Sequence, residues 1–160
     1  TSWFKMRPPH TLGFVCDPKH PASQSFPTDF HANVQWWELV NKTQVMLLDE
    51  FPKGFKPVVQ PIDTWFLNRP LGLIVEAKVG KGKLLICSAD LSSNLDTRPV
   101  ARQLAYSLQQ YMASSTFNPQ TSVDLQVVKN LFDKSYNPNF NTYTKDAPDE
   151  LKVKKNGMNP

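Results

Sequence analysis

Three residues near the N-terminus have the types that a cysteine-dependent enzyme uses. Cys16 is followed directly by Asp17, and His20 lies four residues after the cysteine. A catalytic cysteine needs an exposed thiol with a base beside it, because the thiolate is the nucleophile. Cys16 ends an apolar, strand-like run, so exposure at the end of a strand is compatible with the sequence. The dipeptide His20-Pro21 is equally compatible with an ordinary loop, and both interpretations stay open.

Acidic residues that could act in glycoside hydrolysis are spread along the chain. This chemistry needs two carboxylates roughly 5–10 Å apart across a cleft, and no two of them stand out. Asp90 directly follows an apolar run, at the end of a strand where open α/β sheets hold ligands. Its alternative role is to cap the loop that follows. The eligible residues are Asp17, Asp29, Asp49, Glu50, Asp63, Glu76 and Asp90.

The tetrapeptide Gln35-Trp36-Trp37-Glu38 is the most unusual stretch for ligand binding. Adjacent side chains of a helix point in different directions, so one indole can be buried while the other is exposed. An exposed indole could stack on a sugar ring or on a neighbouring domain, and a plain core role is the alternative. We take no residue as catalytic, and four as candidate carbohydrate-binding residues: Trp36, Trp37, Asp90 and His31.

The sequence does not indicate a metal or a cofactor, and we expect neither. A site built from His20, His31 and Asp29 lacks a pair of ligands at helical positions i and i+4. The segment Gly80-Lys81-Gly82-Lys83 resembles a phosphate-binding loop only superficially, because no helix begins directly after it.

The two cysteines, Cys16 and Cys87, both lie in apolar runs. Neither has a Cys-x-x-Cys partner. We therefore expect buried free thiols that act as small apolar side chains. A disulfide between adjacent strands is the alternative.

Composition limits the class of protein. The chain has 160 residues, of which 40% are hydrophobic, enough for one domain with one core. Its net charge of +4 is mild and scattered, so nucleic acid is not an expected partner. No apolar run approaches the roughly 20 residues of a membrane span. The chain starts at Thr1 without an initiator methionine, and we expect a piece of a longer polypeptide.

Two strands around a tight turn form the centre of the predicted fold. Residues 73–78 alternate in side-chain direction, Gly80-Lys81-Gly82 supplies the turn, and residues 84–87 form a continuous apolar run. A strand that is apolar on both faces is usually central in its sheet, so we expect residues 84–87 to be central. The clearest helix follows, with Thr97 as its cap and Pro99 in its first turn.

Shorter elements complete the prediction. We expect strands at 12–16 and 44–48, an edge or irregular strand at 58–62, and a helix at 123–132. Thr28 or Asp29 should cap a further short helix that reaches Val40. The domain boundaries follow: an N-terminal arm or linker at 1–11, an α/β accessory domain at 12–134, and an irregular or disordered tail at 135–160.

Three segments together resemble a known family: LGFVCDPKHPASQSFPTDFHANVQWWELV, QPIDTWFLNRPLGLIVEAKVGKGKLLICSADL and RPVARQLAYSLQQYM. They resemble the C-terminal region of Bacteroidetes glycoside hydrolase family 2 proteins, which are β-galactosidase-like or sugar-binding. The chain also looks like a class I glutamine amidotransferase-like domain. That resemblance implies an α/β fold with a small mixed sheet, flanking helices and a partial flavodoxin-like architecture.

The chain departs from that fold in one respect, because only one strand precedes His20-Pro21. The amidotransferase nucleophile and the barrel glutamates of the glycosidases have no matching position. The resemblance therefore implies a non-catalytic accessory domain, periplasmic or extracellular, that acts in carbohydrate binding or in domain or oligomer contacts. Its partners would be carbohydrate, neighbouring domains of the parent glycosidase, or a second copy in a homo-oligomer. Glycoside hydrolysis by this chain itself and cysteine-dependent amidase activity remain alternatives.

Overall fold

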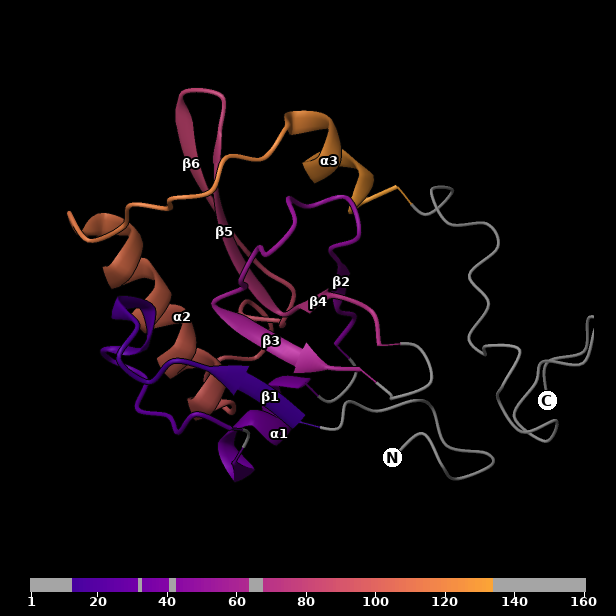
Figure 1. Cartoon of the computed structure of the whole chain (residues 1–160). Helices are drawn as coiled ribbons and strands as arrows, with labels where there is room; N and C mark the ends of the chain where they lie inside the picture. The colour runs from indigo at the N-terminus through magenta and orange to yellow at the C-terminus, as the bar shows by residue number, and fades with distance from the viewer. Residues whose placement is uncertain (1–12, 32, 41–42, 64–67, 134–160) are drawn as a thin grey trace, which may run out of the picture.

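The computed structural model describes residues 13–31, 33–40, 43–63 and 68–133 of the chain (Figure 1). The predicted arm at 1–11 and the predicted tail at 135–160 lie outside the described residues, as do Trp3 and Trp65.

A four-stranded antiparallel sheet is the centre of the fold. Its strands lie in the order β1 (Gly13–Cys16), β3 (Val59–Ile62), β5 (Ile74–Val79) and β6 (Gly82–Cys87). A second, two-stranded sheet pairs β2 (Met46–Leu47) with β4 (Leu71–Gly72), also antiparallel. The protein is therefore a mixed α/β domain with a small antiparallel sheet.

The expected mixed sheet is wrong for the named strands, because all of their pairs are antiparallel. The parallel contact in the described residues is an isolated bridge between Lys78 and Ser122. A flavodoxin-like sheet is built from parallel strands joined by helical crossovers. The flavodoxin-like architecture is accordingly not confirmed.

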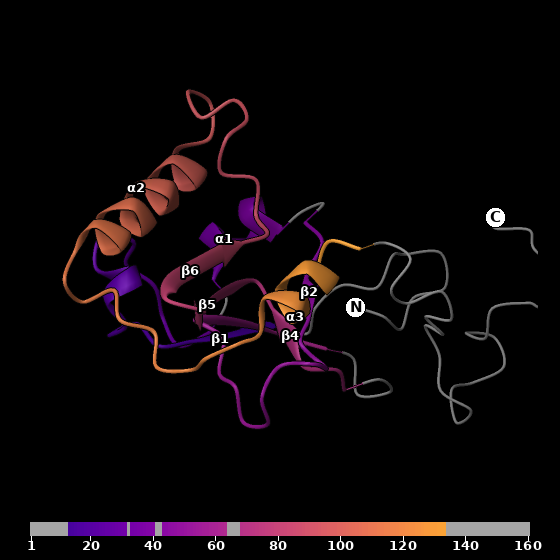
Figure 2. The same cartoon turned by 90° about the horizontal axis from the view of Figure 1, so that it is seen from above.

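In the described part of the chain, four helical segments accompany the sheets: η1 (Pro21–Ser23), α1 (Val34–Val40), α2 (Pro99–Ala113) and α3 (Leu125–Asn130). Seen from above, β5 and β6 lie between α2 and α3, so the two helices cover opposite faces (Figure 2). The α2-side core contains Trp36, Leu39 and Ile74 with Leu104 and Leu108 of α2. The α3-side core contains Met46, Leu48, Phe51, Val75, Ala77, Val123 and Val128.

The predicted hairpin is confirmed, with one correction. Val79 pairs with Gly82 across a two-residue turn, and Gly80 has a φ of 58°, which glycine adopts without strain. However, β6 is an edge strand, whereas β5 is an inner strand. β3, expected as an edge or irregular strand, is also an inner strand. Leu85 and Cys87 pack against the α2-side core, and Leu84 and Ile86 against the α3-side core. The apolar residues on both faces of β6 therefore indicate that both faces are covered. They do not indicate how many strands pair with β6.

The helix predicted from Thr97 is present, but Thr97 does not cap it. The helix begins at Pro99 and Arg98 occupies the N-cap position. The Thr97 hydroxyl instead donates a hydrogen bond to the Asn94 carbonyl. Proline suits the first turn because its missing N–H has no partner there.

The two shorter helices also differ from the prediction at their ends. α1 begins at Val34, so neither Thr28 nor Asp29 caps it. α3 is shorter than the predicted 123–132, and Asp124 caps it by accepting a hydrogen bond from the Gln126 N–H. Among the described residues, no helix is both long and apolar enough to cross a membrane.

The Leu73→Ala variant should lose about 2–5 kcal/mol of unfolding free energy, because a fully buried leucine leaves a cavity. Urea unfolding followed by circular dichroism measures this. The matched control is Leu125→Ala on α3, whose side chain is mostly exposed and should cost no more than about 0.5 kcal/mol. Equal losses in the two variants would contradict the assignment of Leu73 to the core.

Candidate functional site

The two tryptophans of α1 have different environments. Trp36 is 2% exposed; its ring stacks on Phe14 and meets Phe26 edge-on, and its Nε1 donates a 2.8 Å hydrogen bond to Thr28 Oγ1. Its indole is therefore a core group and is not available to a ligand. Trp37 is 65% exposed and remains available for stacking.

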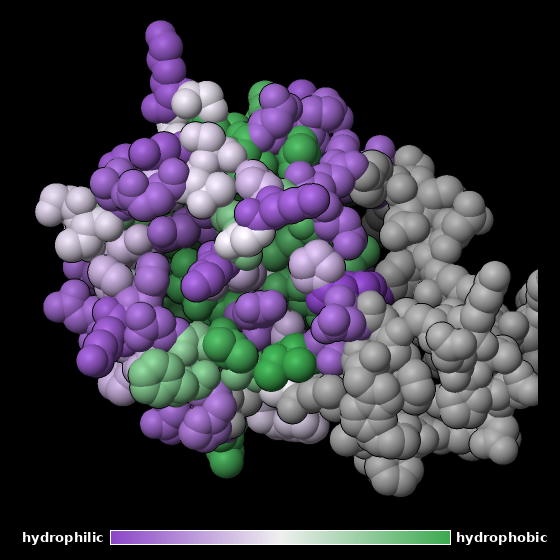
Figure 3. Space-filling model, viewed as in Figure 1, coloured by the Kyte–Doolittle hydropathy of each residue, from purple (hydrophilic) through white to green (hydrophobic). Residues whose placement is uncertain are grey.

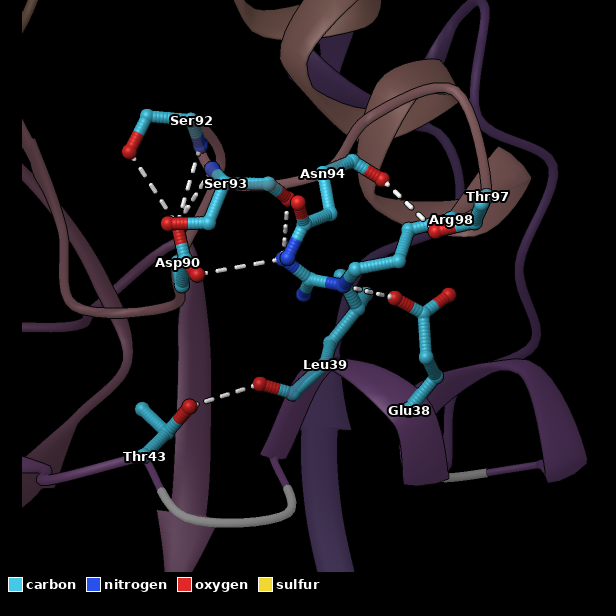
Figure 4. A network of polar contacts seen from close by, with 9 residues as sticks. All are labelled: Glu38, Leu39, Thr43, Asp90, Ser92, Ser93, Asn94, Thr97 and Arg98. Carbon is cyan, nitrogen blue, oxygen red and sulfur yellow. Dashed lines mark hydrogen bonds and ion pairs between the residues drawn. The ribbon is translucent and has the colours of Figure 1, made fainter.

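Asp90 lies in a network of polar contacts at the end of β6 (Figure 4). Its Oδ1 accepts hydrogen bonds from the N–H groups of Ser92 and Ser93, both 3.0 Å long, and from the Ser92 hydroxyl. These backbone bonds, first from Ser93 and then from Ser92, hold the pKa of Asp90 well below its usual range. The carboxylate thus caps the loop, which is the alternative that the sequence left open.

Arg98 connects this loop to α1. Its Nη1 donates to Asp90 Oδ2 at 3.2 Å and to the Ser93 carbonyl at 3.0 Å, and its Nε donates to Glu38 Oε1 at 2.7 Å (Figure 4). Glu38 is the neighbour of Trp37 in α1. Arg98 therefore links Asp90 to α1, the helix that contains Trp37.

His31 lies apart from that network. It is exposed and forms an isolated antiparallel bridge with Val15 of β1. The structure shows no hydrogen bond or ion pair that joins His31 to Trp36, Trp37 or Asp90 within the described residues. The four predicted carbohydrate-binding residues therefore do not form one contiguous polar site.

The two cysteines are free thiols, as predicted, but Cys87 is only half-buried. Cys16 is buried; its Sγ donates to the Asp29 carbonyl at 3.0 Å, and burial raises its pKa. Burial also raises the pKa of Cys87 to about 11. A raised pKa disfavours the thiolate that nucleophilic catalysis requires.

His20 is not the base that a cysteine nucleophile would need, because its polar partners are other groups. Its Nδ1 accepts a 3.2 Å hydrogen bond from the Ala22 N–H, which caps η1. Its Nε2 lies 4.0 Å from Glu76 Oε1. These contacts orient the imidazole toward the sheet, so the geometry does not favour the amidase alternative.

A cluster of Glu76, Tyr111 and His20 was not predicted. Glu76 projects from β5 toward α2, where the Tyr111 hydroxyl donates a 2.7 Å hydrogen bond to its Oε2. The His20 ring meets the Tyr111 ring edge-on at 5.4 Å. Burial, then the hydrogen bond to Glu76, raises the pKa of Tyr111. The signal in the sequence was an acidic residue between the apolar residues Val75 and Ala77 of an inner strand.

This cluster is satisfied internally, so we assign it a structural role. The Glu76 carboxylate accepts from one side chain and faces a second, which offsets the cost of placing a charge near the core. It ties β5, α2 and the turn that precedes η1 to one another. Among the described residues, no group of three His, Cys, Asp or Glu side chains could hold a metal ion.

Two further cavities lie among the described residues. One, of about 380 Å³, lies between β2, the end of β6 and α3; its wall is mostly apolar and also contains Asp49, Glu50 and Asp133. The Asn130 amide donates to Glu50, and both residues line this cavity. The smaller, of about 260 Å³, lies between η1 and α2 and has a polar wall.

Alkylation of Cys16 by iodoacetamide should be at least about tenfold slower in the folded chain than in urea, because burial disfavours the reactive thiolate. Peptide mass spectrometry after timed quenching measures the two rates separately for Cys16 and Cys87. Rapid labelling of Cys16 in the folded chain would restore the amidase alternative.

Stability should fall as the pH rises above about 10, the ordinary pKa of tyrosine. Because the pKa of Tyr111 is raised, the folded chain holds a proton that the unfolded chain releases, and this contribution is fully present below that pH. In Tyr111→Phe, which keeps the ring, this part of the decline should be absent. Urea unfolding at several alkaline pH values tests this, and equal slopes in both proteins would contradict it.

Comparison with known proteins gives one assignment. No curated protein matches the chain. The family model described as Domain of unknown function (DUF8487) matches residues 1–133, which include every residue that the structure describes and most of the chain. The chain therefore belongs to the DUF8487 family.

Proposed function

We propose that the chain is a non-catalytic accessory domain of a glycoside hydrolase family 2-like protein, and that it acts in domain or oligomer contacts. The link to glycosidases comes from the three segments quoted above. The contact role is supported by one observation, an exposed apolar surface on α1 and on the edge of the sheet.

This surface, called here the α1–β1 surface, consists of Val15, Phe30, Val34 and Trp37. Their side chains are all more than half exposed, and Val34 is 90% exposed. Val34 and Trp37 are three residues apart and share a face of α1. Figure 3 shows hydrophobic residues gathered on the lower part of the molecule, where Figure 1 draws β1 and α1. Exposed apolar groups that gather on one part of the surface are typical of interaction sites.

The environments of the candidate catalytic groups favour a non-catalytic role. Asp90 is occupied by two backbone donors and Arg98. Glu76 is occupied by Tyr111, and Cys16 is buried. General acid–base and nucleophilic chemistry both require groups that can reach a substrate. Glycoside hydrolysis by this chain is therefore a weaker proposal than the contact role.

Carbohydrate binding is the second candidate, and the exposure of Trp37 favours it. An exposed indole offers a large apolar face with a polar edge, which suits a sugar ring. Under either role the protein would be periplasmic or extracellular, as the resemblance implies. The same resemblance is the basis for proposing that further chain completes a flavodoxin-like fold around the antiparallel sheet.

Hydrogen–deuterium exchange tests the contact role. The chain is compared with the protein expressed from its complete reading frame, and sedimentation of the chain over a range of concentrations detects pairing with a second copy. Backbone amides at 13–16 and 34–40 should exchange more slowly in the longer protein, or in the associated chain, because a covered surface opens less often.

The control is the β5–β6 turn at Gly80-Lys81, which lies outside the α1–β1 surface and should exchange equally in both proteins. Unchanged exchange at 13–16 and 34–40, together with a monomeric chain, would contradict the contact role.

A further inference from the structure

The smaller cavity, between η1 and α2, lies in a part of the fold that the predicted site residues do not reach. We infer that it is a binding site for a neutral, hydroxyl-rich ligand of the size of a monosaccharide. The inference rests on the wall of the cavity and does not require the contact role proposed above.

Hydrogen bonds between α2 and the segment around η1 hold the walls of this cavity in place. Ser107 of α2 is 2% exposed; its hydroxyl donates to the Ala22 carbonyl at 2.7 Å and accepts from the Ser25 N–H at 3.2 Å. One turn earlier in α2, the Gln103 side-chain amide donates to the Ser25 carbonyl. The segment after η1 is therefore fixed to α2 on both sides of Ser25. A wall that is already ordered loses little entropy when a ligand binds.

The side chains free to bind a ligand lie on both walls. Tyr106 and Gln110 are four residues apart, so they are neighbours on one face of α2, and Gln24 faces them from the segment after η1. None of these three side chains forms a hydrogen bond with another residue in the described part of the chain. Two amides and a phenol offer both donors and acceptors.

The residue types that line the cavity indicate the class of ligand. Within the described residues, the cavity is lined by serine, threonine, glutamine, tyrosine and proline, with no charged side chain. An anionic or cationic ligand would lose its hydration without gaining a counter-charge. A neutral polyol would gain hydrogen bonds from Gln24, Gln110 and the Tyr106 hydroxyl.

The half-exposed ring of Tyr106 supplies the apolar part of the site. Sugar rings have an apolar C–H face and polar edges, and an aromatic ring bordered by amides matches both. The volume, about 260 Å³, lies below the roughly 300 Å³ where pockets for drug-sized ligands begin. It therefore suits one sugar unit rather than a chain of them.

Nuclear magnetic resonance titration of the isotopically labelled chain tests the inference. The probes are the methyl glycosides of β-galactose, β-glucose and α-mannose, with sodium sulfate as the charged comparison. At least one glycoside should shift the amide signals of 21–25 and 106–116 and the side-chain amides of Gln24 and Gln110. The shifts should saturate with a Kd on the order of 1 mM, as expected for few contacts with a small ligand.

Matched variants locate the site. Tyr106→Ala and Gln110→Ala should each weaken binding about tenfold, which corresponds to the loss of one favourable contact. Tyr106→Phe should retain most of the affinity because it keeps the ring. Gln109→Ala, an exposed neighbour outside the cavity, should bind like the parent. Retained amide spectra show that each variant is folded.

Several results would overturn the inference. They are the absence of saturable shifts with all three glycosides, binding that survives both Tyr106→Ala and Gln110→Ala, and sulfate binding at these same residues. Binding lost in Trp37→Ala but kept in Gln110→Ala would move carbohydrate recognition to α1. Hydrogen–deuterium exchange at 13–16 and 34–40 measures a different surface. A failure of the contact role can therefore be distinguished from a failure of ligand binding in the cavity.

Discussion

The inner strand β5 carries side chains into two separate cores, and the helices on both faces of the sheet depend on it. Val75 and Ala77 are buried in the α3-side core, while Ile74 is buried in the α2-side core. Glu76 is the exception on the α2 side, where its charge must be compensated. The hydroxyl of Tyr111 supplies this compensation through a hydrogen bond, and the imidazole of His20 lies 4.0 Å from the carboxylate. One carboxylate of β5 thus contacts both α2 and the turn before η1.

Arg98 organises the opposite end of α2. Helices usually begin with a Ser, Thr, Asn or Asp side chain that bonds to the first free N–H groups. Here the N-cap residue is an arginine whose side chain makes no such bond and instead joins Glu38 and Asp90. The start of α2 is consequently fixed from outside the helix. This arrangement accounts for the position of α1 beside the loop that follows β6.

The features that depend on residues close together in the sequence could be predicted from the sequence. The turn at Gly80, the proline in the first turn of α2 and the loop-capping role of Asp90 all rest on local geometry. Strand order could not be predicted, because periodicity reports which faces are covered and not which strands pair. The cap of α2 was misassigned because Arg98 is satisfied by Asp90, Ser93 and the distant Glu38, and none of these bonds follows a local capping pattern.

The same reasoning applies to the candidate sites. Trp36 and Trp37 are adjacent, and no local signal decides which indole faces the core; the rings of Phe14 and Phe26 decide it. The cluster of Glu76, Tyr111 and His20 joins residues that are up to 91 positions apart, so spacing alone does not reveal it. The small cavity likewise arises from the packing of η1 against α2, through a serine that has no motif around it.

The separation of the two cores by β5 has a consequence for how the family can vary. Side chains on one face of a strand do not touch those on the other, so a change in one core reaches the other only through the backbone between them. Each face can therefore accumulate its own compensating substitutions over evolutionary time, provided that β5 keeps its register with β6. Divergent members of the family should accordingly preserve the backbone path of this strand more closely than the identity of the residues on either side.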